Sequence, residues 1–427
     1  SEAYSRPPAY KAVIKMKTLK EIQFFLALGF LLTLSVTYKP VVEIFFPLYS
    51  SVQLSRLFAF PLLLVTALLI VQSPKKEWRI PKVHQYYLGF LGVLLLTLPF
   101  SLAPQLSFRH FLSVIFGFLV SFSLYHTFRE RPFYVFISAL LAGLILTSAI
   151  AVLNLMLSNL GIQPYWGEFR TDAAIGLFAR FHEGGIYALT LWLMFLAVLF
   201  QGESIHPKPN RILLFSGVFL GSFLLLASGK VSNMVGLAAA LVGYLIYFRN
   251  KAALKKVMLT TALLAAQLLL MLLMFKNVFN RIAFRVQSRL LDRVSGTPEA
   301  DFVEDNFQNT LNALADHPLT GTGLGAYQHF YGSPTLHGTF LRIAGEAGLL
   351  GLSAFILFLI FTFWLLRKKL KENSATPNDW LFHFFPLLLG LIVSWMYNYE
   401  LTNPVFWILF AVLAVSLEQN TKKITHN

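Results

Sequence analysis

Long apolar runs separated by polar stretches dominate the chain. A helix needs roughly 20 apolar residues to cross the bilayer core, and backbone in lipid must satisfy its own hydrogen bonds. The pattern therefore predicts an all-α, polytopic integral membrane protein with about twelve transmembrane helices. The runs lie at about 22–38, 57–73, 85–101, 110–127, 133–160, 184–201, 212–228, 233–248, 257–275, 347–366, 380–398 and 405–418.

One interval between these runs, 276–346, is much longer than the others. Loops of this length usually carry function or lack fixed structure. We therefore expect a large extramembrane loop that carries the site. The remaining parts are a tail over 1–21, nine helices over 22–275, three helices over 347–418 and a tail over 419–427.

Positive charge alternates between the two sides of the predicted bundle. Lys and Arg gather near 75–82, 129–131, 208–211, 249–256 and 367–371. These loops share one side if successive helices alternate in direction, and cytoplasmic loops are rich in Lys and Arg. We expect both termini in the cytoplasm and the long loop in the periplasm.

Composition supports a membrane protein, because 56% of residues are hydrophobic and 13% are charged, against about 25% charged in soluble proteins. The net charge of +15 is typical of cytoplasmic loops of membrane proteins, so we expect membrane lipids and no nucleic acid as partners. The chain has no cysteine, which excludes disulfides, thiolate metal sites and a cysteine nucleophile.

Several cations lie on the predicted outer side, where the charge bias does not account for them. Arg guanidinium groups and Lys ammonium groups both bind phosphate oxygens, so the cations predict a pyrophosphate site. For the four arginines between 281 and 293, the alternative is an interfacial amphipathic helix. For Lys230, the alternative is a lysine that extends its charge to the membrane surface. The last four recur every fourth residue and share one helical face. The cations are Arg170, Arg180, Lys230, Arg281, Arg285, Arg289 and Arg293.

A glycine-rich stretch lies between the long loop and the next apolar run. Residues 315–352 read ADHPLTGTGLGAYQHFYGSPTLHGTFLRIAGEAGLLGL. Gly321, Gly323 and Gly325 allow backbone conformations that other residues resist. The stretch resembles the signature of the O-antigen ligase and O-antigen polymerase superfamily, in which a glycine-rich turn precedes a histidine, a glutamate and a membrane span. The family often has Asn after the histidine, where this chain has Gly338.

Two further segments resemble family motifs. Ser228-Gly229-Lys230 is similar to a Ser-Arg pair at the start of a span, with Lys for Arg and one residue inserted. The segment GLFARFHEGGIYAL is similar to an arginine followed by a glycine-rich entry into a span, and Arg180 and Glu183 match it. Arg170 is the other candidate arginine, and a local ion pair with Arg180 is the alternative for Glu183.

The resemblance implies a glycosyltransferase of the bacterial inner membrane with its active site facing the periplasm. The implied donor is a glycan on undecaprenyl pyrophosphate, and the implied acceptor is lipid A–core oligosaccharide. His337 is the implied base, because neutral imidazole can take a proton from an attacking hydroxyl; His329 is its rival. The cations bind the donor, except that no role is assigned to Arg293. The supporting residues are Glu183, Gly323, Gly325 and Glu346.

We expect no cofactor and no metal, because no acidic cluster surrounds the outer histidines at ligand spacing. The same signature also fits an O-antigen or exopolysaccharide polymerase and a protein O-oligosaccharyltransferase. A transporter or flippase of lipid-linked sugars is the alternative from another class. Transporters usually have midplane charges or related halves, whereas this chain concentrates its polar residues in one outer loop.

Overall fold

The computed structural model describes most of the helical part of the chain. The described residues are 8–34, 37–38, 52–53, 55–73, 79–162, 173, 181–201, 211–287, 301–327, 338–372, 380–399 and 401–425.

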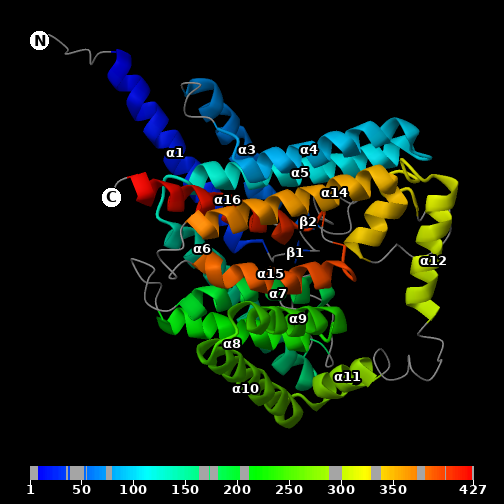
Figure 1. The fold of residues 1–427 in the computed structure, drawn as a ribbon. Helices are drawn as coiled ribbons and strands as arrows, with labels where there is room; N and C mark the ends of the chain where they lie inside the picture. Colours follow the sequence, from blue (N-terminus) through cyan, green and yellow to red (C-terminus); the bar gives the residue numbers. More distant parts are fainter. Residues whose placement is uncertain are drawn as a thin grey trace, which may run out of the picture.

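Each predicted apolar run overlaps a helix (Figure 1), although the run at 22–38 extends beyond the end of α1 at Leu32. Among the described residues, eight helices are long and apolar enough to cross a membrane. Three further apolar helices in that part of the chain are shorter, namely α8, α15 and the part of α16 from Pro404 to Gln419. The predicted all-α, polytopic membrane fold is confirmed. The helices are α1 (Pro8–Leu32), α3 (Ser55–Gln72), α4 (Lys82–Thr97), α5 (Pro104–Phe128), α6 (Phe133–Asn159), α7 (Phe181–Gln201), α8 (Arg211–Ala227), α9 (Val231–Phe248), α10 (Lys251–Met274), α14 (Thr339–Glu372), α15 (Trp380–Trp395) and α16 (Pro404–Thr425).

The predicted loop over 276–346 contains helices of its own. The helix α11 covers Lys276–Val286, α12 covers Asp301–Asp316, and α14 begins at Thr339 rather than near residue 347. Hydropathy alone missed this start, because the first turns of α14 carry polar side chains. The short helix η2 (Leu98–Phe100) links α4 to α5, and β1 (Thr37–Tyr38) pairs antiparallel with β2 (Val52–Gln53).

The first helix also begins earlier than the predicted boundary between tail and span. It begins at Pro8, whereas the sequence pattern placed a tail over 1–21. Proline suits the first turn of a helix, where its missing N–H costs nothing. Lys, Ala and Met favour helix without being apolar enough as a group to predict a span. The polar start of α1 is therefore helical.

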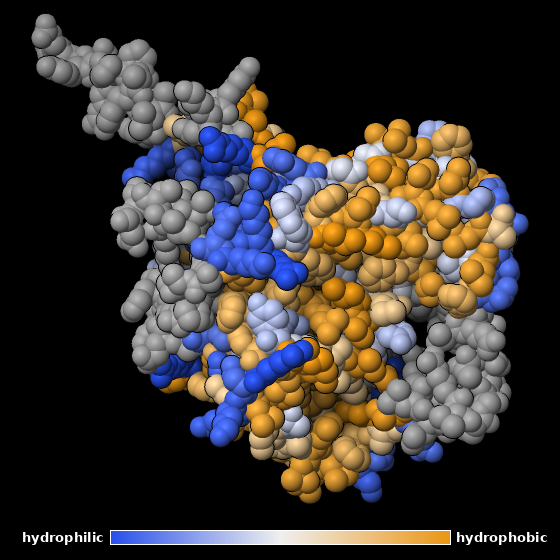
Figure 2. Space-filling model, viewed as in Figure 1, coloured by the Kyte–Doolittle hydropathy of each residue, from blue (hydrophilic) through white to orange (hydrophobic). Residues whose placement is uncertain are grey.

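Two helices form the centre of the bundle. From residue 184 to 198 in α7, and from 404 to 417 in α16, every residue is buried. A helix that is apolar on all sides can be enclosed in this way. Among the packing partners, α16 contacts α4, α5, α6 and α7, while α15 contacts α7, α9 and α14. Figure 2 shows a broad hydrophobic surface over the helices, with hydrophilic residues gathered beside the termini.

The bundle has two distinct ends. The ion pair between Arg131 and Glu21, at 2.9 Å, and the bond from Gln419 Nε2 to the Arg131 carbonyl, at 2.6 Å, join α1, the α5–α6 link and α16. Both termini lie at this end, and α12 lies at the other (Figure 1). We call them the terminal end and the loop end. The predicted cytoplasmic loop at 129–131 lies at the terminal end. The predicted loop at 249–256 lies there too, and its Lys256 donates to the Phe200 carbonyl at the end of α7.

At the loop end, α14 is broken and a loop fills the break. Gly348 has φ +65° and ψ −167°, so the helical bonds are interrupted there. In a continuous helix the N–H groups of Leu349 and Leu350 would bond to the carbonyls of Gly345 and Glu346. They donate instead to the carbonyls of Pro318 and Leu319, at 2.9 and 3.1 Å.

The loop satisfies the two carbonyls that the break leaves open. Thr322 N donates to the Gly345 carbonyl at 3.0 Å, and Gly323 N donates to the Glu346 carbonyl at 2.8 Å. Unpaired backbone groups are costly inside a membrane protein. The exchange therefore anchors residues 318–323 to α14. The N–H groups after the break and the carbonyls before it all have hydrogen-bond partners.

Glycine is required where the loop and the helix meet. Gly321, Gly323 and Gly325 have φ values of +66°, +106° and +70°, which confirms the predicted backbone conformations. A Cβ at Gly321 would lie 2.5 Å from the backbone of Glu346, and one at Gly348 would overlap the Leu319 carbonyl oxygen. Gly321 and Gly348 thus allow the backbones of the loop and the helix to approach closely.

This arrangement predicts that Gly348→Ala destabilises the fold. The φ and ψ of Gly348 are those of glycine alone, and another residue there costs about 1–3 kcal/mol before any overlap is relieved. Gly89→Ala in α4 is the control, because nothing lies within 4 Å of a Cβ at that position. Unfolding in detergent can be followed by the fluorescence of the seven tryptophans. Equal melting temperatures for the two variants would contradict the role of the break.

Candidate functional site at the loop end

The first turns of α14 carry a buried ion pair. Arg342 and Glu346 are four residues apart, so their side chains meet on one face of the helix. The Arg342 Nε lies 2.8 Å from the Glu346 Oε1, and the two side chains are 12% and 5% exposed. The Arg342 guanidinium also stacks on the ring of Tyr399, 3.8 Å from its centroid. A buried carboxylate needs a partner of this kind, so the predicted supporting residue Glu346 is held in place.

Tyr399 is a neutral phenol in this cluster. Burial raises its pKa, the Arg342 guanidinium opposes the rise and the Glu346 carboxylate adds to it. The cluster therefore contains one positive and one negative charge on α14, with an uncharged ring against them.

The N-terminus of α14 is fixed to the end of α15. Thr339 Oγ1 donates to the Asn398 carbonyl at 2.6 Å. Gly338 has φ +94°, and a Cβ there would overlap the Met396 carbonyl oxygen. The close approach accounts for glycine at this position, where the family often has Asn. It also fixes the chain directly after the predicted base, His337.

Asn398 joins the N-terminus of α14 to the start of α9. Its side-chain oxygen accepts from Ser232 Oγ at 3.2 Å. Its amide nitrogen donates to Asn233 Oδ1 at 3.0 Å and to Ser394 Oγ at 2.7 Å. Asn398 is 2% exposed, so these bonds are shielded from water. One buried asparagine thus links α9, α15 and α14.

Three cations converge on the turn between α8 and α9. Gly229 makes the turn with φ +62°, and Lys230 is the N-cap of α9, with no side-chain bond to the first-turn N–H groups. Arg281 Nε would lie 3.5 Å from a Cβ at Gly229, and Arg285 Nη1 lies 3.4 Å from the Gly229 carbonyl oxygen. A helix N-terminus beside positive side chains favours an anion.

The start of α7 packs against the same turn. A Cβ at Gly185 would overlap Ser228 Oγ and lie 2.7 Å from Asn233 Nδ2. Glu183 lies two residues earlier, in the first turn of α7, and its side chain is outside the described residues. Two of the predicted motifs, far apart in sequence, therefore meet at the loop end.

The glycine-rich loop rests on α5. A Cβ at Gly323 would overlap Ser101 Oγ, and one at Gly325 would overlap the imidazole of His110. Leu102 N donates to the Thr322 carbonyl at 2.9 Å. The two predicted supporting glycines, Gly323 and Gly325, thus let the backbone of the loop lie against Ser101 and His110.

The structure brings together only part of the predicted site. Lys230, Arg281 and Arg285 lie at one turn, and α11, which carries both arginines, ends at Val286. Glu346 lies on α14 near the anchored Gly338. The other predicted residues lie outside the described residues: Arg170, Arg180, Arg289, Arg293, His329 and His337.

Sequence reasoning missed Arg342, Tyr399 and Asn398. The spacing of Arg342 and Glu346 is a signal for an ion pair on a helix. The polar residues that interrupt the apolar pattern after Trp395 were a weaker signal for Asn398. Tyr399 and Asn398 contact residues of other helices, α14 and α9, so spacing could not identify these contacts.

These features define a multi-pass membrane protein with a cation-rich turn and a loop-filled helix break at one end. Residues 216–356 match the model of the family described as O-antigen ligase. The match contains the α8–α9 turn, α11 and the break in α14. This part of the chain is therefore similar to the O-antigen ligase family, in agreement with the motifs of the sequence. No curated protein matches the chain.

Breaking the Arg342–Glu346 pair should destabilise the protein more than removing it entirely. Arg342→Met leaves a buried carboxylate without its charge partner, which costs about 3–5 kcal/mol. The double variant Arg342→Met, Glu346→Leu removes both charges and should recover most of that loss. Denaturation of both variants in detergent measures the difference. A double variant as unstable as the sum of the two single variants would contradict the pairing.

Proposed function

We propose that this protein is an O-antigen ligase. It transfers a glycan from undecaprenyl pyrophosphate to lipid A–core oligosaccharide at the periplasmic face of the inner membrane. The observation that carries the proposal is the convergence of Lys230, Arg281 and Arg285 at the N-terminus of α9. This turn lies at the loop end, away from the termini, which we place in the cytoplasm.

In this proposal the three cations bind the pyrophosphate of the donor. Arg forks and a Lys point charge suit its oxygens, and the first-turn N–H groups of α9 add donors. Arg170, Arg180 and Arg289 complete the donor site. As the glycosidic bond breaks, the pyrophosphate gains negative charge, and the cations stabilise that charge in the transition state.

His337 acts as the general base. It takes the proton of the acceptor hydroxyl while the hydroxyl oxygen attacks the anomeric carbon, and the bond from that carbon to the pyrophosphate oxygen breaks. A single displacement inverts the anomeric carbon. Support comes from the residues after it, because Gly338 and Thr339 are fixed to α15 and Asn398 joins them to α9. The base and the donor site would then share one rigid frame.

Neutralising the cations tests the donor site. Arg281→Ala and Arg285→Ala should each lower kcat/KM for the lipid-linked donor by about 10- to 100-fold, since a charged hydrogen bond contributes about 1.5–3 kcal/mol. Lys230→Arg should retain activity, because it keeps the charge. Lys276→Ala is the matched control, since Lys276 is an exposed cation on the same helix. If Arg281→Ala and Arg285→Ala behave like Lys276→Ala, the pyrophosphate site lies elsewhere.

Replacing the histidines tests the base. His337→Ala should lower turnover by about 10²- to 10⁴-fold, the usual contribution of general-base catalysis, while donor binding stays near the wild-type level. His329→Ala should cost far less. In the wild type, the rate should fall as the pH drops through about 6.5, because protonated imidazole cannot accept a proton. Full turnover by His337→Ala would rule out this assignment and make Glu183 the next candidate.

A further inference from the structure

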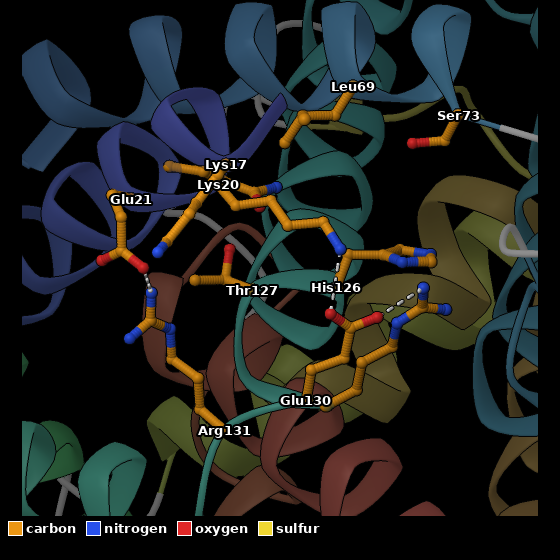
Figure 3. Close-up of a pocket in the computed structure, with 11 residues that line it drawn as sticks. Lys17, Lys20, Glu21, Leu69, Ser73, His126, Thr127, Glu130 and Arg131 are labelled. Carbon is orange, nitrogen blue, oxygen red and sulfur yellow. Dashed lines mark hydrogen bonds and ion pairs between the residues drawn. The ribbon is translucent and has the colours of Figure 1, made fainter. Parts of the chain in front are cut away.

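A cavity of about 310 Å³ lies at the terminal end, opposite the proposed donor site. It is bounded by the polar start of α1, the last turn of α3 and the α5–α6 link (Figure 3). Ligand cavities in proteins usually hold about 300–1,000 Å³. The space is therefore large enough for a small polar headgroup.

Positive charge exceeds negative charge in the lining. The cations are Lys17, Lys20, Arg129 and Arg131, and the acids are Glu21 and Glu130. The dashed lines in Figure 3 mark the ion pairs of this lining. Lys20 Nζ lies 3.1 Å from Glu130 Oε2, and Arg131 Nη2 lies 2.9 Å from Glu21 Oε1.

The ion pairs leave capacity for an anion. Arg129 shares Glu130 with Lys20, at 3.4 Å. Both Lys20 and Glu130 are close to half exposed, and exposed pairs of this kind are weak. Ser73 also lines the space, and its hydroxyl contacts the Met16 Sδ at 3.7 Å. A phosphate can therefore replace Glu130 as the partner of Lys20 without disrupting a buried network.

Apolar side chains continue from the cavity along the same helices. Phe25 lies one turn beyond Glu21 on α1 and is 66% exposed. Leu68 and Val71 on α3 are 41% and 84% exposed. Exposed apolar groups on a membrane-spanning helix face the acyl chains of lipid. The cavity thus lies beside exposed apolar side chains of α1 and α3.

We propose that this cavity binds the phosphate headgroup of an anionic phospholipid. Basic pockets between transmembrane helices on the cytoplasmic side suit such headgroups, and the long lysine stems can reach a phosphate at the interface. The lipid tails then lie along the exposed apolar faces of α1 and α3. This site is separate from glycan transfer and does not depend on the proposed function.

Native mass spectrometry of the full-length protein tests the proposal with phosphatidylglycerol and phosphatidylcholine as probes. The wild type should retain phosphatidylglycerol in preference to phosphatidylcholine. Lys17→Gln, Lys20→Gln should weaken retention of phosphatidylglycerol by about tenfold or more, as expected when about 1.4 kcal/mol of binding is lost. Ser73→Trp should weaken it as well, because the indole fills the space without changing the charge.

The matched control is Lys251→Gln, Lys255→Gln, which removes two exposed lysines at the same end but outside the cavity. It should retain phosphatidylglycerol like the wild type. Equal losses in both double variants would mean diffuse surface charge and would overturn the proposal. Inorganic phosphate is the second probe, added without lipid. Saturable phosphate binding that needs Lys17 and Lys20, with no preference between the two lipids, would assign the cavity to soluble phosphate and overturn the lipid assignment.

Discussion

The arrangement of the loop end depends on the exchange of hydrogen bonds at the break in α14. Gly348 interrupts the helix, so two carbonyls and two N–H groups lose their helical partners. The backbone at 318–323 satisfies all four groups. Unpaired backbone polar groups are costly in a buried segment such as this one, so the loop and the helix stabilise each other. This contact explains Gly321 and Gly348, because a side chain at either position would separate the two backbones.

The break also determines where the functional groups lie. The half of α14 before Gly348 carries Arg342 and Glu346, and its first residue, Thr339, bonds to the carbonyl of Asn398. Asn398 in turn accepts from Ser232, two residues after Lys230. Buried polar contacts thus join the first residue of α14 to the start of α9, next to the cation turn. Buried hydrogen-bond networks rigidify a fold, which would suit the proposed site for a donor and an acceptor.

The sequence allowed the helical fold to be predicted almost completely, because apolar runs of span length leave little choice in lipid. The errors concern polar helical segments. The start of α1 at Pro8 and of α14 at Thr339 were missed because hydropathy does not register a helix whose charges are paired or solvated. The positive φ of Gly321, Gly323 and Gly325 was predictable from residue type.

The candidate site was predictable only where charge or a motif made it visible. Lys230, Arg281 and Arg285 were expected from their charge on the outer side, and they lie at one turn. Asn398 was not predictable, because its partners Ser232 and Thr339 are brought to it by the packing of α9, α14 and α15. The backbone exchange at Gly348 was hidden for the same reason, since its partners are carbonyls and N–H groups that every residue has.

The central claim is that the turn before α9, with the two arginines of α11, binds the pyrophosphate of the donor. A cryo-EM structure of the protein with undecaprenyl pyrophosphate bound tests this claim most directly. The account predicts density for the two phosphates within hydrogen-bond distance of Lys230, Arg281 and Arg285, at the N-terminus of α9. Phosphate density elsewhere, with these three side chains left without contact to it, would contradict the account.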